Sequence, residues 1–364
     1  MKPSKGIIMS TIQSQVLVND FETVDEDLFS FAENKTIVIS GATGFIGSLL
    51  SRFFIWANET YDLGVKLILV ARNLDKLKSI LPDVAQRDDI DIVRRDFSQP
   101  CEPLHIKFDY LVHTAAITTS KTMIDYPINV LDVSYYGAKW ALESARMSCN
   151  SKVLYLSSME ANGHFSVSTV ATEDTLGTVD LASVRSCYPE GKRICELMCR
   201  AYSEQLGIHA VVGRLAQTFG AGILPSEGRV FKQFAMSAIN DQPIILHTDG
   251  SSEGNYVYSI DALRAVFVLL TKGKDGETYN IANEECHMTI RDMAQMVVDN
   301  FGGKNTRLIV ESNDAVGYGY AAPTKMLLSA AKLRALGWKP VVNLFEAYEV
   351  LLKYLKEQTL TERS

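Results

Sequence analysis

Apolar positions along this chain follow two different periods. Short runs rich in β-branched residues predict buried strands, and segments with apolar residues three and four apart predict helices. The runs fall at 36–40, 65–72, 90–96, 108–116, 151–158 and 209–220. Helical periodicity covers 134–147 and a segment that begins near Tyr188. Strands that alternate with helices predict an α/β fold, a doubly wound parallel sheet with helices on both faces.

The pattern changes after Gly220, where a loop is followed by short strands mixed with helices. We expect residues 35–220 to form the sheet domain, with 256–272 returning to it. Residues 221–255 and 273–364 are expected to form a smaller C-terminal α/β lobe that binds substrate over the carboxyl ends of the strands. Residues 1–34 are expected to be an N-terminal extension with a short helix capped by Asp25.

Composition narrows the classes of protein that fit. The 364 residues carry a net charge of −7 and no basic run, which disfavours nucleic acid as a partner. We find no apolar stretch of transmembrane length and no signal peptide, so we expect a cytoplasmic protein without membrane contacts. The six cysteines lack a CxxC pair and the six histidines lack metal-ligand spacing, which predicts reduced thiols and no metal site.

The segment "GATGFIG" (41–47) follows the first predicted strand and opens a helix. In this context, Gly41 and Gly44 allow a tight turn and the close approach of a pyrophosphate, and Gly47 allows close helix–sheet packing. The intervening Thr43, Phe45 and Ile46 complete the turn, and the helix N-terminus offers N–H groups to phosphate. The segment predicts a dinucleotide site.

The form of the nicotinamide cofactor stays open from the sequence. NAD binders usually carry an acidic residue after the second strand, and this chain has "LVARNLDKL" there, with Arg72 where a 2′-phosphate could bind. We predict NAD, and we keep NADP as the alternative because of Arg72. Further contacts are expected after the third and fourth strands, from Asp96 and Phe97 beside the adenine and from Thr114, Ala115 and Ala116 along the cofactor.

Tyr188 and Lys192, in "SCYPEGKRICE", are four residues apart and so share one helix face. An ammonium near a phenol lowers the pKa of the phenol, because the positive charge favours phenolate. Such a phenol could act as general base on a substrate hydroxyl.

Taken in order, the glycine motif, "HTAA", "LSSMEANG" and Tyr-x-x-x-Lys resemble the extended short-chain dehydrogenase/reductase family, over about residues 35 to 345. Within it, "RSCYPEGKRICE", "GRLAQTFG" and "GRVFKQF" are similar to segments of UDP-glucuronate decarboxylases. The resemblance implies a Rossmann fold, NAD and a nucleotide-sugar substrate. It also implies a homodimer through helices 134–147 and 188–206, with which the apolar Trp140, Ile194 and Met198 are compatible; the alternative is that these three residues belong to the chain's own core.

The same resemblance implies the roles of the site residues. Tyr188 would be the base, Lys192 would orient it and bind the nicotinamide ribose, and Ser158 would bind the same substrate hydroxyl. Glu160 would also lie in the active site, and the expected substrate-binding residues are Gln217, Arg229 and Tyr256.

Met159 helps to distinguish the reactions of this family. The related 4,6-dehydratases use an Asp–Glu pair at the positions of Met159 and Glu160, and methionine cannot donate a proton. We therefore expect a decarboxylase, with a 4,6-dehydratase or a 4-epimerase as alternatives.

Three positions depart from the pattern of the family. Gly254 stands where an arginine normally helps to bind the substrate, Ser134 stands where an asparagine is usual, and Gln217 also replaces an asparagine. A lost charged contact could weaken substrate binding. A catalytically weak, cofactor-binding sensor or scaffold therefore stays open as an interpretation from another functional class.

Overall fold

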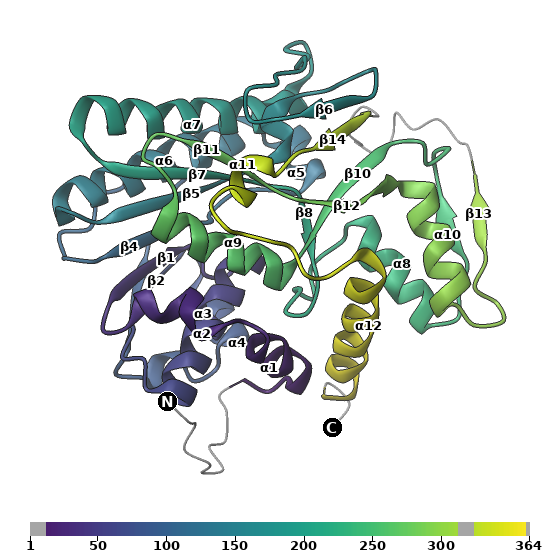
Figure 1. Cartoon of the computed structure of the whole chain (residues 1–364), viewed down its shortest axis with the longest axis horizontal. Coiled ribbons are helices and arrows are strands. Elements are labelled where there is room, and N and C mark those ends of the chain that lie inside the picture. The colour runs from purple at the N-terminus through teal and green to yellow at the C-terminus, as the bar shows by residue number, and fades with distance from the viewer. Residues whose placement is uncertain (1–11, 312–323, 362–364) are drawn as a thin grey trace.

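The computed structural model describes residues 12–311 and 324–361. A seven-stranded parallel sheet forms its centre, in the order β11-β7-β5-β4-β1-β2-β3 (Figure 1). Its strands are β1 (Thr36–Ser40), β2 (Lys66–Ala71), β3 (Ile90–Arg94), β4 (Tyr110–His113), β5 (Lys152–Ser158), β7 (His209–Leu215) and β11 (Thr278–Ile281). The predicted doubly wound α/β fold is confirmed.

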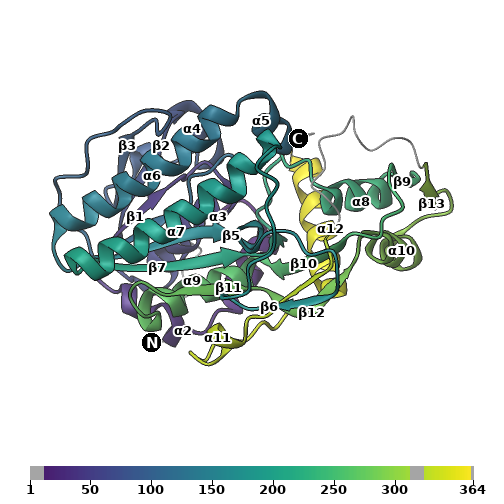
Figure 2. The same ribbon diagram turned by 90° about the horizontal axis from the view of Figure 1, so that it is seen from above.

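Helices cover both faces of this sheet (Figure 2). The helices α6 (Pro127–Ser148) and α7 (Cys187–Leu206) lie side by side on one face, and α3 (Phe45–Tyr61) and α9 (Ser259–Lys272) cover the other. Along β1, Ile37 and Ile39 pack into the core on the α3 side and Val38 packs into the core on the α6 side. Both strand faces are buried, which explains the continuous apolar runs in the sequence.

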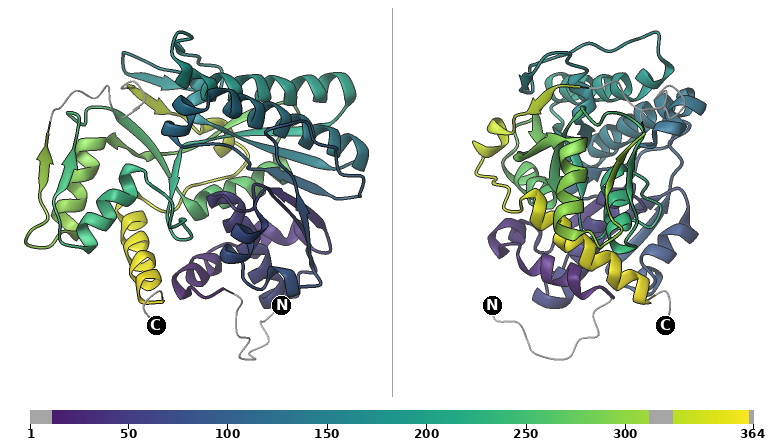
Figure 3. Two further views of the ribbon diagram at one scale, coloured as in Figure 1. Left: turned by 180° about the vertical axis from the view of Figure 1, so that it is seen from behind. Right: turned by 90° about the vertical axis from the view of Figure 1, so that its right-hand side faces the viewer.

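Smaller sheets and helices form a second lobe beside the central sheet (Figure 3). Strand β10 (Glu253–Tyr258) pairs with β8 (Gln217–Phe219) and β12 (Asn283–Thr289), while β9 (Ile244–Leu246) pairs with β13 (Leu308–Val310) and β6 (Thr169–Ala171) with β14 (Met326–Leu328). The long helices of the lobe are α8 (Val230–Ile239), α10 (Ile290–Phe301) and α12 (Leu344–Thr361).

Two expected boundaries differ in the structure. The predicted strand 209–220 is divided into β7 and β8, because β8 leaves the central sheet to pair with β10. Residues 273–364 were expected to lie in the smaller lobe, but β11 from this range pairs with β7 and so belongs to the central sheet.

The N-terminal segment is part of the fold from residue 12 onward, and residues 1–11 lie outside the described part. Its helices α1 (Gln15–Glu22) and α2 (Glu26–Phe29) bury Phe21 and Phe29, which pack edge-on against Phe53 of α3 at 5.3 and 5.2 Å between ring centroids. Asp25 precedes α2, but its side chain makes no capping hydrogen bond. In its described part, the N-terminal extension is therefore held to the core by aromatic packing.

Further findings concern the expectations about membrane, metal, thiols and the dimer helices. No helix among residues 12–311 and 324–361 is long and apolar enough to cross a bilayer, and these residues contain no cluster that could hold a metal ion. All six cysteines are free. On the expected dimer helices, Trp140 is buried at 2% exposure, Met198 packs partly against the core, and Ile194 is 48% exposed.

Candidate active site

The glycine-rich turn joins β1 to α3 at the carboxyl edge of the central sheet. Gly41 has φ +76°, a conformation that side chains disfavour, and a Cβ atom there would lie 2.6 Å from the Ala115 nitrogen and 2.7 Å from Thr114 Oγ1. The Thr114 hydroxyl donates to the Ser40 carbonyl at 2.7 Å, which ties the end of β4 to the end of β1. The turn therefore has room only for glycine at this position.

The same turn leaves the start of α3 open. Gly44 is the N-cap residue, and no side chain caps the helix, so the first-turn N–H groups of Phe45, Ile46 and Gly47 are not bound by a capping side chain. A Cβ atom on Gly47 would lie 2.3 Å from the Gly41 carbonyl oxygen. Together with the partly exposed Thr43, this arrangement fits the pyrophosphate of a dinucleotide at a helix N-terminus.

The other expected cofactor contacts lie at the same edge of the sheet. Ala115 and Ala116 follow β4 and are partly exposed, and Asp96 follows β3 and accepts the Ser98 N–H at 3.0 Å. Phe97 differs from its expected role beside the adenine, because its ring is buried against Trp140, 5.1 Å away between ring centroids.

Tyr188 and Lys192 lie in the first two turns of α7, and both side chains are buried. The Lys192 ammonium donates to the Leu156 carbonyl of β5 at 2.8 Å and lies 5.9 Å from the centroid of the Tyr188 ring. Helix α7 and strand β5 thus bring together the two residues that the sequence identifies as the catalytic pair.

The pKa of Tyr188 does not follow the sequence-based expectation. Burial raises it to about 12, and the charge of Glu160 adds to the rise, while a hydrogen bond with Ser158 and the charges of Arg229 and Arg185 oppose it. Burial also lowers the pKa of Lys192 to about 8. The expected lowering of the phenol pKa by Lys192 is therefore wrong in this structure, where desolvation of the phenolate is the largest effect.

Ser158 and Glu160 lie where β5 ends and a short 3₁₀ helix (Met159–Asn162) begins. The Ser158 hydroxyl accepts the Glu160 N–H at 3.2 Å, and the Glu160 carboxylate accepts two hydrogen bonds from Arg185, at 2.8 and 3.1 Å. Arg185 was not among the expected site residues. Its position in "RSCYPEGKR", three residues before Tyr188, was the available signal.

A buried ion pair holds α7 against the sheet behind the site. Glu196 of α7 accepts hydrogen bonds from Arg214 of β7 at 2.7 and 2.9 Å and from Ser157 of β5 at 2.5 Å. Breaking one partner of such a buried pair costs roughly 3–5 kcal/mol. The pair was also missed from the sequence, because its partners lie 18 and 39 residues apart.

His113 is a second buried group beneath the site that the sequence did not indicate. Its Nδ1 lies 2.8 Å from Ser40 Oγ, and its ring stacks on Tyr155 with centroids 5.6 Å apart. Burial, together with the charge of Lys192, lowers the pKa of His113 to about 3, so the imidazole is neutral at physiological pH.

The expected substrate residues belong to the smaller lobe. Arg229 precedes α8, pairs with Glu227 at 2.6 Å, and its charge opposes the rise in the pKa of Tyr188, so it lies within electrostatic reach of that tyrosine. Gln217 lies on β8, next to Tyr256 of β10 in the strand register, and its side chain is partly exposed.

Tyr256 differs from its expected role in substrate binding. Its side chain is fully buried, its ring lies edge-on to Phe219 at 6.0 Å, and its hydroxyl has no hydrogen-bond partner among the described residues. A Cβ atom on Gly254 would lie only 2.4 Å from that hydroxyl, so the tyrosine ring covers the point from which a side chain at position 254 would extend.

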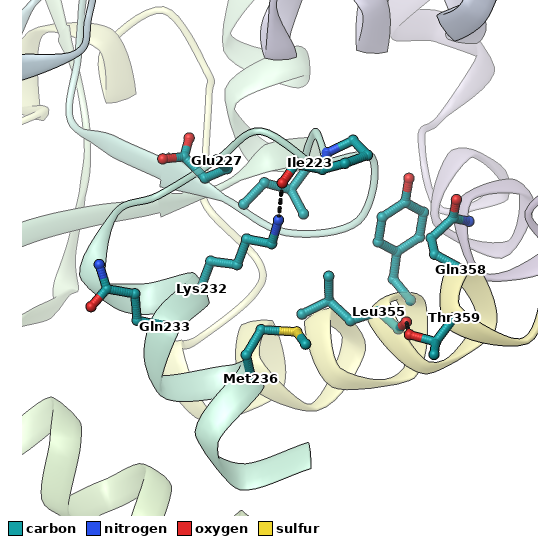
Figure 4. Close-up of a pocket in the computed structure, with 10 residues that line it drawn as sticks. Ile223, Glu227, Lys232, Gln233, Met236, Leu355, Gln358 and Thr359 are labelled. Carbon is teal, nitrogen blue, oxygen red and sulfur yellow. Dashed lines mark hydrogen bonds between the residues drawn. The ribbon is translucent and has the colours of Figure 1, made fainter. Parts of the chain in front are cut away.

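A cavity of about 400 Å³ lies elsewhere. It is formed between α8 and α12 and is lined by residues such as Ile223, Lys232, Met236 and Leu355 (Figure 4). None of the expected catalytic or cofactor residues lines it. The cavity is therefore distinct from the site around Tyr188, which we define by its side-chain chemistry.

The fold and the site define a dinucleotide-dependent enzyme with a tyrosine–lysine pair. The chain belongs to the NAD dependent epimerase/dehydratase family, whose sequence model matches residues 37–282. The family is NAD-dependent, in agreement with the predicted cofactor.

Similar proteins include UDP-glucuronic acid decarboxylase 1 of Danio rerio, 26% identical over 328 residues, which cover 90% of this chain and 74% of the relative. UDP-glucuronic acid decarboxylase 6 of Arabidopsis thaliana is 26% identical over 321 residues, 88% of this chain and 89% of the relative.

Among solved structures, the epimerase Mth375 of Methanothermobacter thermautotrophicus superposes with a TM-score of 0.72 at 22% identity, over 93% of this chain and 96% of the other. The UDP-glucuronic acid 4-epimerase of Bacillus cereus, solved with UDP-glucuronic acid and NAD, gives a TM-score of 0.71 at 19% identity, over 89% and 99%. At these identities the likeness supports the fold.

Proposed function

We propose that this chain is a lyase that uses NAD to remove carbon dioxide from a nucleotide-linked uronic acid, with UDP-glucuronate as the best candidate. The observation that carries the proposal is the arrangement of the site. Tyr188 is hydrogen-bonded to Ser158 and lies near the carboxylate of Glu160, and Met159 stands where a dehydratase needs a second acid. The sequence similarity to UDP-glucuronic acid decarboxylases supports it.

The reaction begins with removal of a proton from the sugar 4-hydroxyl by the Tyr188 phenol oxygen, while Ser158 holds the same hydroxyl. Bound oxidised NAD supplies the hydride acceptor for carbon 4 and a positive charge that lowers the pKa of the phenol. The resulting ketone lies β to the carboxylate on carbon 5. The carbon–carbon bond to that carboxylate then breaks, carbon dioxide leaves, and the electron pair moves into the ketone as an enolate. Protonation of the enolate at carbon 5 gives the 4-keto pentose. Return of the hydride to carbon 4, with the proton held by Tyr188 going back to the 4-oxygen, then gives the 4-hydroxy pentose and restores the oxidised cofactor.

The remaining expected residues take supporting roles in this proposal. Lys192 orients Tyr188 and binds the nicotinamide ribose, the central-sheet domain holds the cofactor, and Arg229 and Gln217 of the smaller lobe contact the nucleotide sugar. We also propose a cytoplasmic homodimer formed through α6 and α7. In its support, large apolar side chains are exposed on both helices, among them Ile128 and Leu131 on α6 and Ile194 and Leu197 on α7.

A 4-epimerase is the second candidate, because it would need the same first proton transfer from the 4-hydroxyl. It requires no acid at position 159, so the side-chain chemistry of this site is compatible with it. A 4,6-dehydratase is disfavoured by Met159. A scaffold without activity is disfavoured by the arrangement of the buried Tyr188 and Lys192 beside the partly exposed Ser158.

Mass spectrometry of UDP-glucuronate incubated with the full chain and NAD tests the proposal. We expect a UDP-pentose, together with the loss of the mass of carbon dioxide. A product of unchanged mass but altered retention would favour the 4-epimerase, and loss of water from a nucleotide hexose would show a dehydratase. A protein that binds NAD but converts none of these substrates would contradict the proposed activity.

A further inference from the structure

Two arginines flank the position expected to bind the adenosine ribose. Arg72 directly follows β2, and Arg94 is the last residue of the neighbouring strand β3. The register pairs Ala71 with Arg94, and the strands are parallel, so both arginines stand together at the carboxyl edge of the sheet. In doubly wound folds this edge binds the ligand, and the end of the second strand meets the ribose.

Both side chains are exposed, and neither takes part in an ion pair among the described residues. The charges of Arg72 and Arg94 both contribute to lowering the pKa of Asp96, so the two guanidinium groups lie within electrostatic reach of one carboxylate. The next residue, Arg95, is engaged differently, because it donates to the carbonyls of Glu102 and Arg94 at 3.4 and 2.9 Å.

The acidic residue that would hold a ribose 2′-hydroxyl is missing from the end of β2. The residues there are Ala71, Arg72 and Asn73, and the Asn73 side chain accepts the Lys76 N–H at 2.9 Å as the cap of α4 (Leu74–Ile80). Asp75 comes only in the first turn of that helix. A carboxylate at the end of β2 repels a 2′-phosphate, and arginine binds one through charge-assisted hydrogen bonds.

We infer that the adenosine end of this cofactor site binds a 2′-phosphate, so that the chain accepts the phosphorylated dinucleotide NADP at least as well as NAD. The inference concerns this chain's own residues and goes beyond the NAD dependence of the family. The carboxylate of Asp96 would repel the 2′-phosphate, but it is one negative charge beside the two positive guanidinium groups of Arg72 and Arg94. Its oxygen is also engaged by the Ser98 N–H, which spreads part of its negative charge.

The test is a binding measurement on the full chain and needs no substrate. Oxidised NADP and NAD are titrated separately by calorimetry, and we expect NADP to bind as tightly as NAD or up to about tenfold more tightly. Arg72→Gln and Arg94→Gln should each weaken NADP binding by roughly tenfold, about the strength of one charge-assisted contact, and leave NAD binding within about twofold. The NADP affinity should also fall more steeply with added salt.

Arg146→Gln is the matched control, because Arg146 is an exposed arginine of α6 that pairs only with Glu143 of the same helix. It should change neither affinity, and thermal melting of each variant establishes that it is folded. If NAD binds and NADP binds measurably more weakly than NAD, the inference is overturned and the NAD site stands. Equal losses of NAD and NADP affinity in Arg72→Gln would also overturn it. If neither dinucleotide binds, the cofactor site itself is assigned wrongly.

Discussion

The two sides of the active site differ in which polar groups they bury. On the catalytic side, formed by β5, α7 and β7, Glu196 is bonded by both Arg214 and Ser157, and Lys192 donates to a main-chain carbonyl. On the substrate side, formed by β8, β10 and α12, the hydroxyls of Tyr256 and Tyr348 are buried without hydrogen-bond partners.

An unpaired buried polar atom costs about 1–3 kcal/mol. The catalytic side holds such atoms too, Arg185 Nε and Asn162 Oδ1 among them, whereas on the substrate side they are the hydroxyls of large tyrosine rings. Two of the three departures from the family pattern lie on the substrate side, Gly254 in place of an arginine and Gln217 in place of an asparagine, while the third, Ser134, lies on α6 against α7. In the proposed function, proton transfer and substrate recognition are carried by separate parts of this fold. Tyr188, Lys192 and Ser158 of the first part match the family pattern, while positions 217 and 254 of the second do not.

The largest effect is expected on the catalytic side, from Tyr188→Phe. The substitution removes only the phenol oxygen, and loss of a general base lowers turnover by roughly 10²–10⁴-fold. Cofactor affinity should change by less than about twofold, because Lys192 and the glycine turn are unchanged. The measurement is kcat by mass spectrometry together with dinucleotide titration.

Tyr202→Phe is the matched control for this variant. Tyr202 lies on the same helix and donates to Glu143 at 2.7 Å, away from Ser158 and Glu160, so its loss should leave kcat nearly unchanged. Wild-type turnover in Tyr188→Phe would show that the tyrosine on the catalytic side is not the base.

A smaller effect, on stability, is expected on the substrate side from Gly254→Ala. The new Cβ atom would lie 2.4 to 2.6 Å from three atoms of the fully buried Tyr256 ring, so the ring must shift. Overpacking of this kind costs about 1–3 kcal/mol. Urea unfolding of Gly254→Ala measures it, with Gly228→Ala as control, because a Cβ atom there meets nothing within 4 Å.

A second variant on the substrate side, Tyr256→Phe, tests what the buried hydroxyl contributes. It removes an unpaired buried hydroxyl, so we expect stability to stay the same or to rise by about 1 kcal/mol, with KM unchanged. A marked rise in KM would instead support the sequence-based assignment of Tyr256 to substrate binding, although its side chain is buried.

The sequence predicted the catalytic side better than the substrate side, for physical reasons. Local signals identified the strands, the glycine turn and the Tyr188–Lys192 pair, because each is set by residues within one turn or one strand. The pKa of Tyr188, the Glu160–Arg185 contact and the ring of Tyr256 over Gly254 depend on how distant segments pack. A sequence pattern contains no measure of that burial.

A pH-dependent effect on stability is expected far from the site, in the N-terminal helices, where Asp20 accepts a hydrogen bond from Tyr258 at 2.5 Å. Burial raises the pKa of Asp20 from 3.8 to about 6. The folded protein therefore binds this proton more tightly than the unfolded chain does. The resulting stability is fully present below pH 4 and is lost as the pH rises through 6, by an amount on the order of 2 kcal/mol.

Asp20→Asn keeps an oxygen that can accept from Tyr258 but cannot ionise. We expect the variant and the wild type to have similar free energies of unfolding near pH 4, and the variant to be the more stable one at pH 7. Denaturant unfolding across this range measures the difference, with the exposed Asp27→Asn as control. A difference that stays constant from pH 4 to pH 7 would mean that Asp20 does not titrate with folding. In that case the aromatic contacts of Phe21 and Phe29 would hold the N-terminal helices to the core without any contribution from this carboxyl group.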